Sequence, residues 1–290
     1  QGTIRDPNFS MRSIAPTKSA ASDWRSRQFQ RNDLPKMIGL ATQRFTRESI
    51  AANFAELVLD PTRLQIAFRT NVRVYFVGEE SGYLNSLGVN TKSEGTSTGT
   101  PLVVFPEIAA NHTIVSYPEL MDPKTRRLDL DKFGPRTEDA PLIPGDFVDL
   151  GTLEPGTRLS FFLHGFDGSR TLGDYVANPD QNPDRLDHIV AIAVSDSPYL
   201  LLGFEDMLGG GDRDYDDCVF VVEMSKDNIA ALLGKLDPWR RFKQGAAILC
   251  AVAGVLGVPT SIAAARRRAR QKRQEQARKR TSQLLAAGQF

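Results

Sequence analysis

The chain has 290 residues, a formal net charge of +1, and 41% hydrophobic and 24% charged residues, which is the composition of a globular protein. Residues 237–290 hold 12 Lys/Arg and two Asp/Glu, which leaves 24 basic and 33 acidic residues in 1–236, a net charge of −9. A body this acidic argues against nucleic-acid binding. The two cysteines, Cys218 and Cys250, lie in dissimilar segments, so we expect no disulfide framework.

Residues 1–44 are interpreted as an extended arm, because they are polar, irregular and interrupted by proline. Residues 1–50 contain nine basic and four acidic residues, opposite in sign to the body. The arm could be disordered, could fold back onto its own body, or could lie on a partner protein. Aromatic residues among arginines are typical of interfaces. The predicted partner-binding residues are Trp24, Arg25, Arg27, Phe29 and Arg31.

Residues 45–236 read as a mainly β domain outside the cytoplasm. Helical spacing predicts one helix at 45–57, and a capped helix closes the domain at 225–236. Residues 118–145, rich in Pro, Asp and Arg, are expected to form a long surface excursion. Strands are predicted at 64–68, 72–76, 102–105, 113–117, 147–150, 158–166, 188–194, 199–204 and 218–224. This pattern favours an antiparallel β-sandwich of jelly-roll-like type with one or two short helices.

An acidic loop, residues 205–217, lies between the last two predicted strands. Its thirteen residues include six carboxylates and three consecutive glycines. Asp212, Asp214 and Asp216 alternate as the first ligands of a calcium loop do. No helix pair flanks the loop and it is not an EF-hand, so the alternative is a solvated acidic turn. The sequence predicts a Ca²⁺ site whose candidate ligands are Glu205, Asp206, Asp212, Asp214, Asp216 and Asp217.

Residues 245–265 contain no charge and, as a helix, would span about 31 Å, the thickness of a hydrocarbon core. We therefore expect a juxtamembrane and transmembrane segment at 237–265 and a basic cytoplasmic tail at 266–290. The alternative is a buried helix of a soluble fold. The predicted anchor residues are Trp239 at one edge, Gly254 and Gly257 for close helix contact, and Arg266, Arg267 and Arg268 at the other edge.

Two motifs carry a family resemblance. They are Asn71–Val77 with Gly82–Gly88, and Leu202–Asp206 with Gly211–Phe220. Together they resemble a bacterial exported domain family catalogued as a domain of unknown function, number 4114, over roughly residues 63–224. The resemblance implies a secreted or surface β domain. Many such proteins end in an anchor that sorting enzymes process after a Pro-Glu-Pro signal. This chain has Leu236-Asp237-Pro238-Trp239 instead, so we expect the anchor to be retained.

Nothing in the sequence marks an active site. The three histidines, His112, His164 and His188, accompany no nucleophile elbow, HExxH motif, phosphate loop or dinucleotide fingerprint. We therefore expect a non-catalytic structural or accessory subunit of the bacterial inner membrane, with its body in the periplasm. Its expected partners are the lipid bilayer and integral membrane proteins of a larger assembly, such as a photosynthetic or other energy-transducing complex. A surface adhesion or carbohydrate-binding module is the alternative, and a hydrolase is the third.

Overall fold

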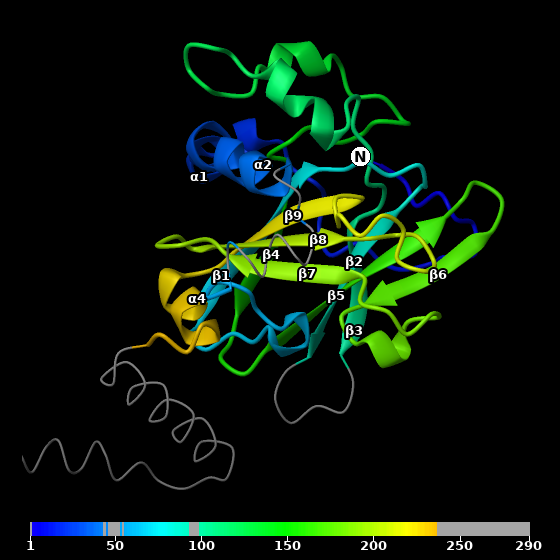
Figure 1. The fold of residues 1–290 in the computed structure, drawn as a ribbon, viewed down its shortest axis with the longest axis vertical. Coiled ribbons are helices and arrows are strands. Elements are labelled where there is room, and N and C mark those ends of the chain that lie inside the picture. The colour runs from blue at the N-terminus through cyan, green and yellow to red at the C-terminus, as the bar shows by residue number, and fades with distance from the viewer. Residues whose placement is uncertain (1, 43–44, 46–52, 54, 93–98, 237–290) are drawn as a thin grey trace, which may run out of the picture. The chain divides into compact units, whose positions relative to one another are not determined.

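The computed structural model describes residues 2–42, 45, 53, 55–92 and 99–236 (Figure 1). The chain divides into two compact units, 1–236 and 237–290, and the second lies outside the described residues. The strands are β1 (Thr70–Gly78), β2 (Ser86–Lys92), β3 (Thr100–Phe105), β4 (Phe147–Leu153), β5 (Arg158–Phe166), β6 (Thr171–Val176), β7 (Ile189–Ala193), β8 (Tyr199–Phe204) and β9 (Cys218–Glu223). The α-helices are α1 (Trp24–Gln28), α2 (Leu34–Thr42) and α4 (Lys226–Leu232). A π-helical segment, η2 (Phe29–Asp33), joins α1 to α2, and the short 3₁₀ helices are η1 (Ala20–Ser22), η3 (Pro61–Arg63), η4 (Ile114–Leu120), η5 (Leu130–Phe133) and η6 (Pro179–Gln181).

The strands form two antiparallel sheets, which confirms the predicted mainly β architecture with few helices. One sheet has the order β4-β1-β9-β8-β7, and the other has the order β3-β2-β5-β6. Buried residues of both sheets join one hydrophobic cluster. Phe161 of β5 contacts Phe220 of β9, with ring centroids 4.9 Å apart. The two sheets therefore pack face to face as a sandwich.

The five-stranded sheet is buried on both faces around β7, β8 and β9, which explains why these three strands are nearly continuous apolar runs. In β9, Cys218, Phe220 and Val222 face the other sheet, whereas Val219 and Val221 face a second hydrophobic cluster. The other strands of this sheet alternate in the same way, as the period-two geometry of a strand requires.

The second face of this sheet is covered by the N-terminal segment and η4 (Figure 1). Phe29 is fully buried and stacks on Tyr75 of β1, with centroids 4.1 Å apart. Leu34 and Ile38 of α2 are also fully buried. The prediction of an extended arm over 1–44 is therefore wrong for residues 20–42. The described body extends from the N-terminal segment to Leu236 as one unit, because this sheet needs a cover for its second apolar face.

The first part of the N-terminal segment, residues 2–18, is called the strap below, since it crosses both sheets. The backbone N–H of Ile14 donates to Val103 of β3, and Lys18 exchanges hydrogen bonds with Phe147 of β4. Farther along, Arg25 pairs with Glu223 at 2.8 Å. Charges of opposite sign thus join the basic N-terminal segment to the acidic body.

Several predicted elements differ from the structure. Residues 113–117 were expected as a strand but lie in the 3₁₀ helix η4, whose position 118 is proline. Residues 64–68 are not a strand, and two strands were missed: β2, and β6, whose sequence Thr-Leu-Gly-Asp-Tyr-Val is half polar. The helix predicted at 45–57 and the transmembrane helix at 245–265 lie mostly or wholly outside the described residues. Within the part of the chain that the structure describes, no helix is long and apolar enough to cross a membrane.

Candidate metal centre

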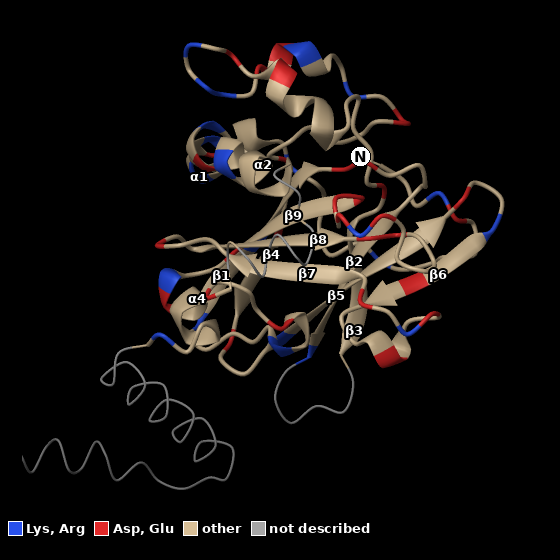
Figure 2. Ribbon diagram, viewed as in Figure 1, with Lys and Arg blue, Asp and Glu red and all other residues tan. Residues whose placement is uncertain are grey.

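The acidic loop, residues 205–217, connects the neighbouring strands β8 and β9. Phe204 at the end of β8 pairs with Cys218 at the start of β9. The loop therefore starts and ends at the same end of these two neighbouring strands. Gly209 and Gly210 have φ values of +90° and +81°, a region that favours glycine. Acidic residues are concentrated in this loop (Figure 2). The folded hairpin therefore gathers the carboxylates that the sequence predicted as ligands.

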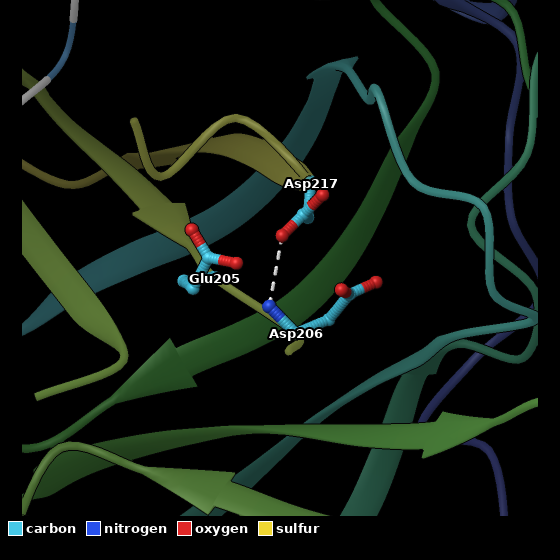
Figure 3. A group of neighbouring side chains, drawn as sticks. All are labelled: Glu205, Asp206 and Asp217. Atoms are coloured by element: carbon cyan, nitrogen blue, oxygen red, sulfur yellow. Dashed lines mark hydrogen bonds between the residues drawn. The ribbon is translucent and has the colours of Figure 1, made fainter. Parts of the chain in front are cut away.

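Two groups of three carboxylates form here, and Glu205 belongs to both. One group is Glu205, Asp206 and Asp217, and the other is Glu205, Asp212 and Asp214. In each group the ligand atoms lie within 4.8 Å of one another. Glu205 and Asp206 are 2% and 3% exposed. The first group surrounds one region between the end of β8 and the start of β9 (Figure 3).

Hydrogen bonds hold these carboxylates in place. The backbone N–H of Asp206 donates to Asp217 Oδ2 at 2.8 Å, and the N–H of Arg213 donates to Glu205 Oε2 at 3.1 Å. Asp206 Oδ2 accepts from Asn85 Nδ2 at 2.6 Å and from the hydroxyl of Ser81. All of these donors are neutral, so they orient the carboxylates without neutralising their charge.

A second segment adds acids that the sequence analysis did not assign to the site. Glu79 and Glu80 follow β1 directly, and the N–H of Glu80 donates to the backbone carbonyl of Asp216 at 3.0 Å. Asn85, also from this segment, is fully buried. The sequence did contain a signal for these residues, because two adjacent glutamates follow an apolar strand and the Gly82–Gly88 motif comes directly after them. Their approach to the loop depends on the pairing of β1 with β9.

Burial and mutual repulsion raise the pKa values of several of these acids. Burial, followed by the charge of Asp214, raises the pKa of Asp216 to about 8. Burial, followed by the charge of Asp206, raises the pKa of Asp217 to about 10. Burial likewise raises the pKa of Glu79 to about 7, and burial and the charge of Asp212 raise that of Glu205. The folded site therefore disfavours its own ionised state unless a positive charge joins it.

Within the described ranges, no Lys, Arg or His forms an ion pair with any acid of the loop or with Glu79 or Glu80. His188, which lies beside the loop, contacts Asp184 at 2.9 Å, and its Nδ1 lies 2.8 Å from the backbone carbonyl of Glu205. Buried carboxylates are normally paired, protonated or bound to a metal.

The alternating acids Asp212, Asp214 and Asp216 do not form one group of three. Asp212 and Asp214 lie with Glu205, whereas Asp216 interacts with Asp214 and Glu80. The two groups supply only oxygen donors, which suit Ca²⁺ or Mg²⁺ better than Zn²⁺. Calcium takes six to eight oxygens, so backbone carbonyls or water would complete the shell.

The predicted partner-binding residues have different surroundings. Phe29 is buried within this chain, and Arg25 binds Asn71 and Glu223. Arg27 donates to the carbonyl of Ala21 at 2.5 Å. Trp24 is 70% exposed, and Arg27 and Arg31 line an open surface hollow. The predicted anchor residues Trp239, Gly254, Gly257 and Arg266–Arg268 lie outside the described residues.

Comparison with known proteins supports the resemblance noted in the sequence. Residues 153–225 match the family model described as "Domain of unknown function (DUF4114)". This segment begins at the end of β4 and includes the whole acidic loop and β9. No curated protein and no solved structure matches the chain.

Proposed function

We propose that this chain, whose residues 153–225 match the DUF4114 family model, is a non-catalytic attachment subunit whose acidic loop binds a divalent cation of the calcium class. One observation carries the proposal. The buried Glu205 and Asp206 lie together with the half-buried Asp217, without an ion-pair partner among the described residues. Proteins meet this situation by protonation or by metal binding.

A cation at the first group would connect three parts of the fold. Glu205 and Asp206 follow β8, Asp217 precedes β9, and Asn85 joins Asp206 to the segment after β1. A bound Ca²⁺ would reverse the repulsion between these carboxylates and tighten the edge of the sheet. Because ligand binding to the folded state alone stabilises that state, the cation would act as a structural element of the domain.

The wider role follows from the charge distribution and the segments at the C-terminus. We propose an extracytoplasmic body, a membrane anchor at 245–265 and a basic tail, in a subunit that stabilises a larger membrane assembly. The exposed Trp24 supports a protein partner, since aromatic side chains are enriched at interfaces. Recovery of a stoichiometric membrane partner in mild detergent would support this role, and purification of the full chain alone would argue against it.

The cation is tested by thermal unfolding of the full chain in calcium and in chelator, together with elemental analysis. At a calcium concentration of 100 times Kd, binding adds about 2.7 kcal/mol, which shifts the Tm of a domain of this size by roughly 5–10 °C. Glu205→Gln removes a ligand from both groups at constant volume and should abolish most of the shift. Glu119→Gln is the matched control, because Glu119 is exposed on η4 and outside both groups. No bound metal and no calcium shift in the wild type would refute the site.

A further inference from the structure

A hollow of about 440 Å³ lies on the four-stranded sheet, away from the acidic loop. Its wall is built from β2, β3, β5 and β6, together with Met11 of the strap, Thr62 of η3 and Gln181 of η6. The volume is within the range of about 300–1,000 Å³ that is typical of small-molecule sites. None of the residues that the cation proposal uses lines it.

Strand register explains which side chains reach this surface. Asn90 of β2 pairs with Pro101 of β3 on one side and with Ser160 of β5 on the other. In β5, Leu159, Phe161 and Leu163 belong to the buried core between the sheets. The residues between them in the strand, including Ser160 and Phe162, point to the opposite face and therefore face outward. The hollow thus lies on the outer face of this sheet.

The hollow combines an apolar floor with polar edges. Phe162 lies over Gly88 of the neighbouring strand, because a Cβ at Gly88 would be 2.0 Å from its ring. Pro101 and Val176 extend this apolar surface. The polar side chains around it are neutral or acidic: Thr62, Asn90, Ser160, Asp174, Asn178 and Gln181. Among the described residues that line the hollow, none is Lys, Arg or His.

Two of these polar groups have fixed positions. The Oδ1 atom of Asn90 is buried beside Gly99 and has no hydrogen-bond partner among the described residues, so the rest of the Asn90 amide is the part that can face a ligand. Asp174 is held by His164, whose Nδ1 lies 2.7 Å from Asp174 Oδ1. This contact orients the Asp174 carboxylate, while its side chain remains 51% exposed.

We propose that this hollow is a binding site for a neutral saccharide. Amide, hydroxyl and carboxylate groups match the many hydroxyls of a sugar, which both donate and accept hydrogen bonds. The exposed Pro101 and the half-buried Val176, with the buried Phe162 beside them, suit the apolar C–H face of a sugar ring. Because no cationic side chain among the described lining residues could receive a phosphate or carboxylate, an uncharged ligand fits best. The site would let the domain attach to a glycan independently of its cation.

The test is titration of the full chain with glucose, galactose, mannose, N-acetylglucosamine, maltose and cellobiose, followed by calorimetry or ligand-observed NMR. At least one sugar should bind saturably, and equally in calcium and in chelator, because the cation ligands lie outside the hollow. Asn90→Ala and Gln181→Ala should each weaken binding at least tenfold. Ser160→Tyr, which fills the hollow from an exposed position, should abolish it.

Asp180→Ala is the control, since Asp180 is exposed beside Gln181 but does not line the hollow. It should bind sugar as the wild type does, and each variant should retain the wild-type Tm. Absence of saturable binding to every sugar would overturn the proposal. Unchanged binding in a folded Ser160→Tyr variant would do the same, as would preference for a charged sugar or a peptide. Loss of the calcium shift in Glu205→Gln would not affect this result, so the two proposals fail separately.

Discussion

The contact between the strap and the four-stranded sheet yields a prediction with a defined pH dependence. His164 of β5 lies between two carboxylates, with Nε2 at 3.1 Å from Asp6 Oδ2 and Nδ1 at 2.7 Å from Asp174 Oδ1. Phe9 stacks on the imidazole with centroids 3.8 Å apart. A neutral imidazole can donate from only one nitrogen, so both contacts are satisfied as hydrogen bonds only when His164 is protonated.

The pKa shifts of this pair agree with that geometry. Burial opposes protonation of His164, but its hydrogen bonds to Asp174 and Asp6 outweigh burial and raise its pKa above the usual value of about 6.5. The hydrogen bond from Thr171 is the main cause that lowers the pKa of Asp6. The His164 contribution to stability is therefore complete below about pH 6.5 and is lost as pH rises through the raised pKa. The Asp6 contribution is present above about pH 4 and is lost at lower pH, as its carboxylate becomes protonated.

A double-mutant cycle of Asp6→Asn and His164→Gln measures the coupling directly. A hydrogen bond to a charged group contributes about 1.5–3 kcal/mol, so we expect a coupling free energy of that size from urea unfolding at pH 6. At pH 9 the imidazole is closer to neutral, and the coupling should fall below about 1 kcal/mol. Asp139→Asn is the surface control. Asp139 pairs with Arg5 of the same strap at 2.8 Å but is 92% exposed, so its loss should cost less than about 1 kcal/mol. A coupling below about 0.5 kcal/mol at pH 6, or one that is equal at pH 9, would refute the argument.

Two further predictions concern the packing of the sheet and of the C-terminal helix. Gly203→Ala in β8 places a Cβ 2.2 Å from the carbonyl oxygen of Tyr215, so urea unfolding should show a loss of about 1–3 kcal/mol. Gly39→Ala in α2 meets no atom within 4 Å and should instead stabilise by about 0.5–1 kcal/mol; equal effects of the two changes would contradict the close approach. Asn228 of α4 is fully buried, and its Oδ1 accepts the N–H groups of residues 67–68, both at 2.8 Å. Asn228→Ala should cost about 2–4 kcal/mol at an unchanged m value, and a loss under about 1 kcal/mol would show that water replaces the side chain.

Local patterns in the sequence determined several of the strands closely. The predictions at 158–166, 199–204 and 218–224 agree with β5, β8 and β9 to within a residue. Their β-branched and aromatic residues recur at the period of a strand, and turn residues bound them. The same local information located the acidic loop, because its carboxylates and glycines are consecutive. β6 was not predicted, because its exposed and half-buried residues dilute the alternation.

Tertiary structure decided which residues meet across long distances in the chain. The N-terminal segment has no strong periodicity, yet Phe29 becomes part of the core because the five-stranded sheet presents a second apolar face. Glu79, Glu80 and Asn85 reach the loop only through the pairing of β1 with β9, and spacing alone could not reveal this. The pairing of β8 with β9 brings Asp217 to Glu205 and Asp206, whereas Asp216 interacts with Asp214 and Glu80. A sequence specifies the period of each strand locally, but the neighbours of a side chain depend on register and on the face to which it points.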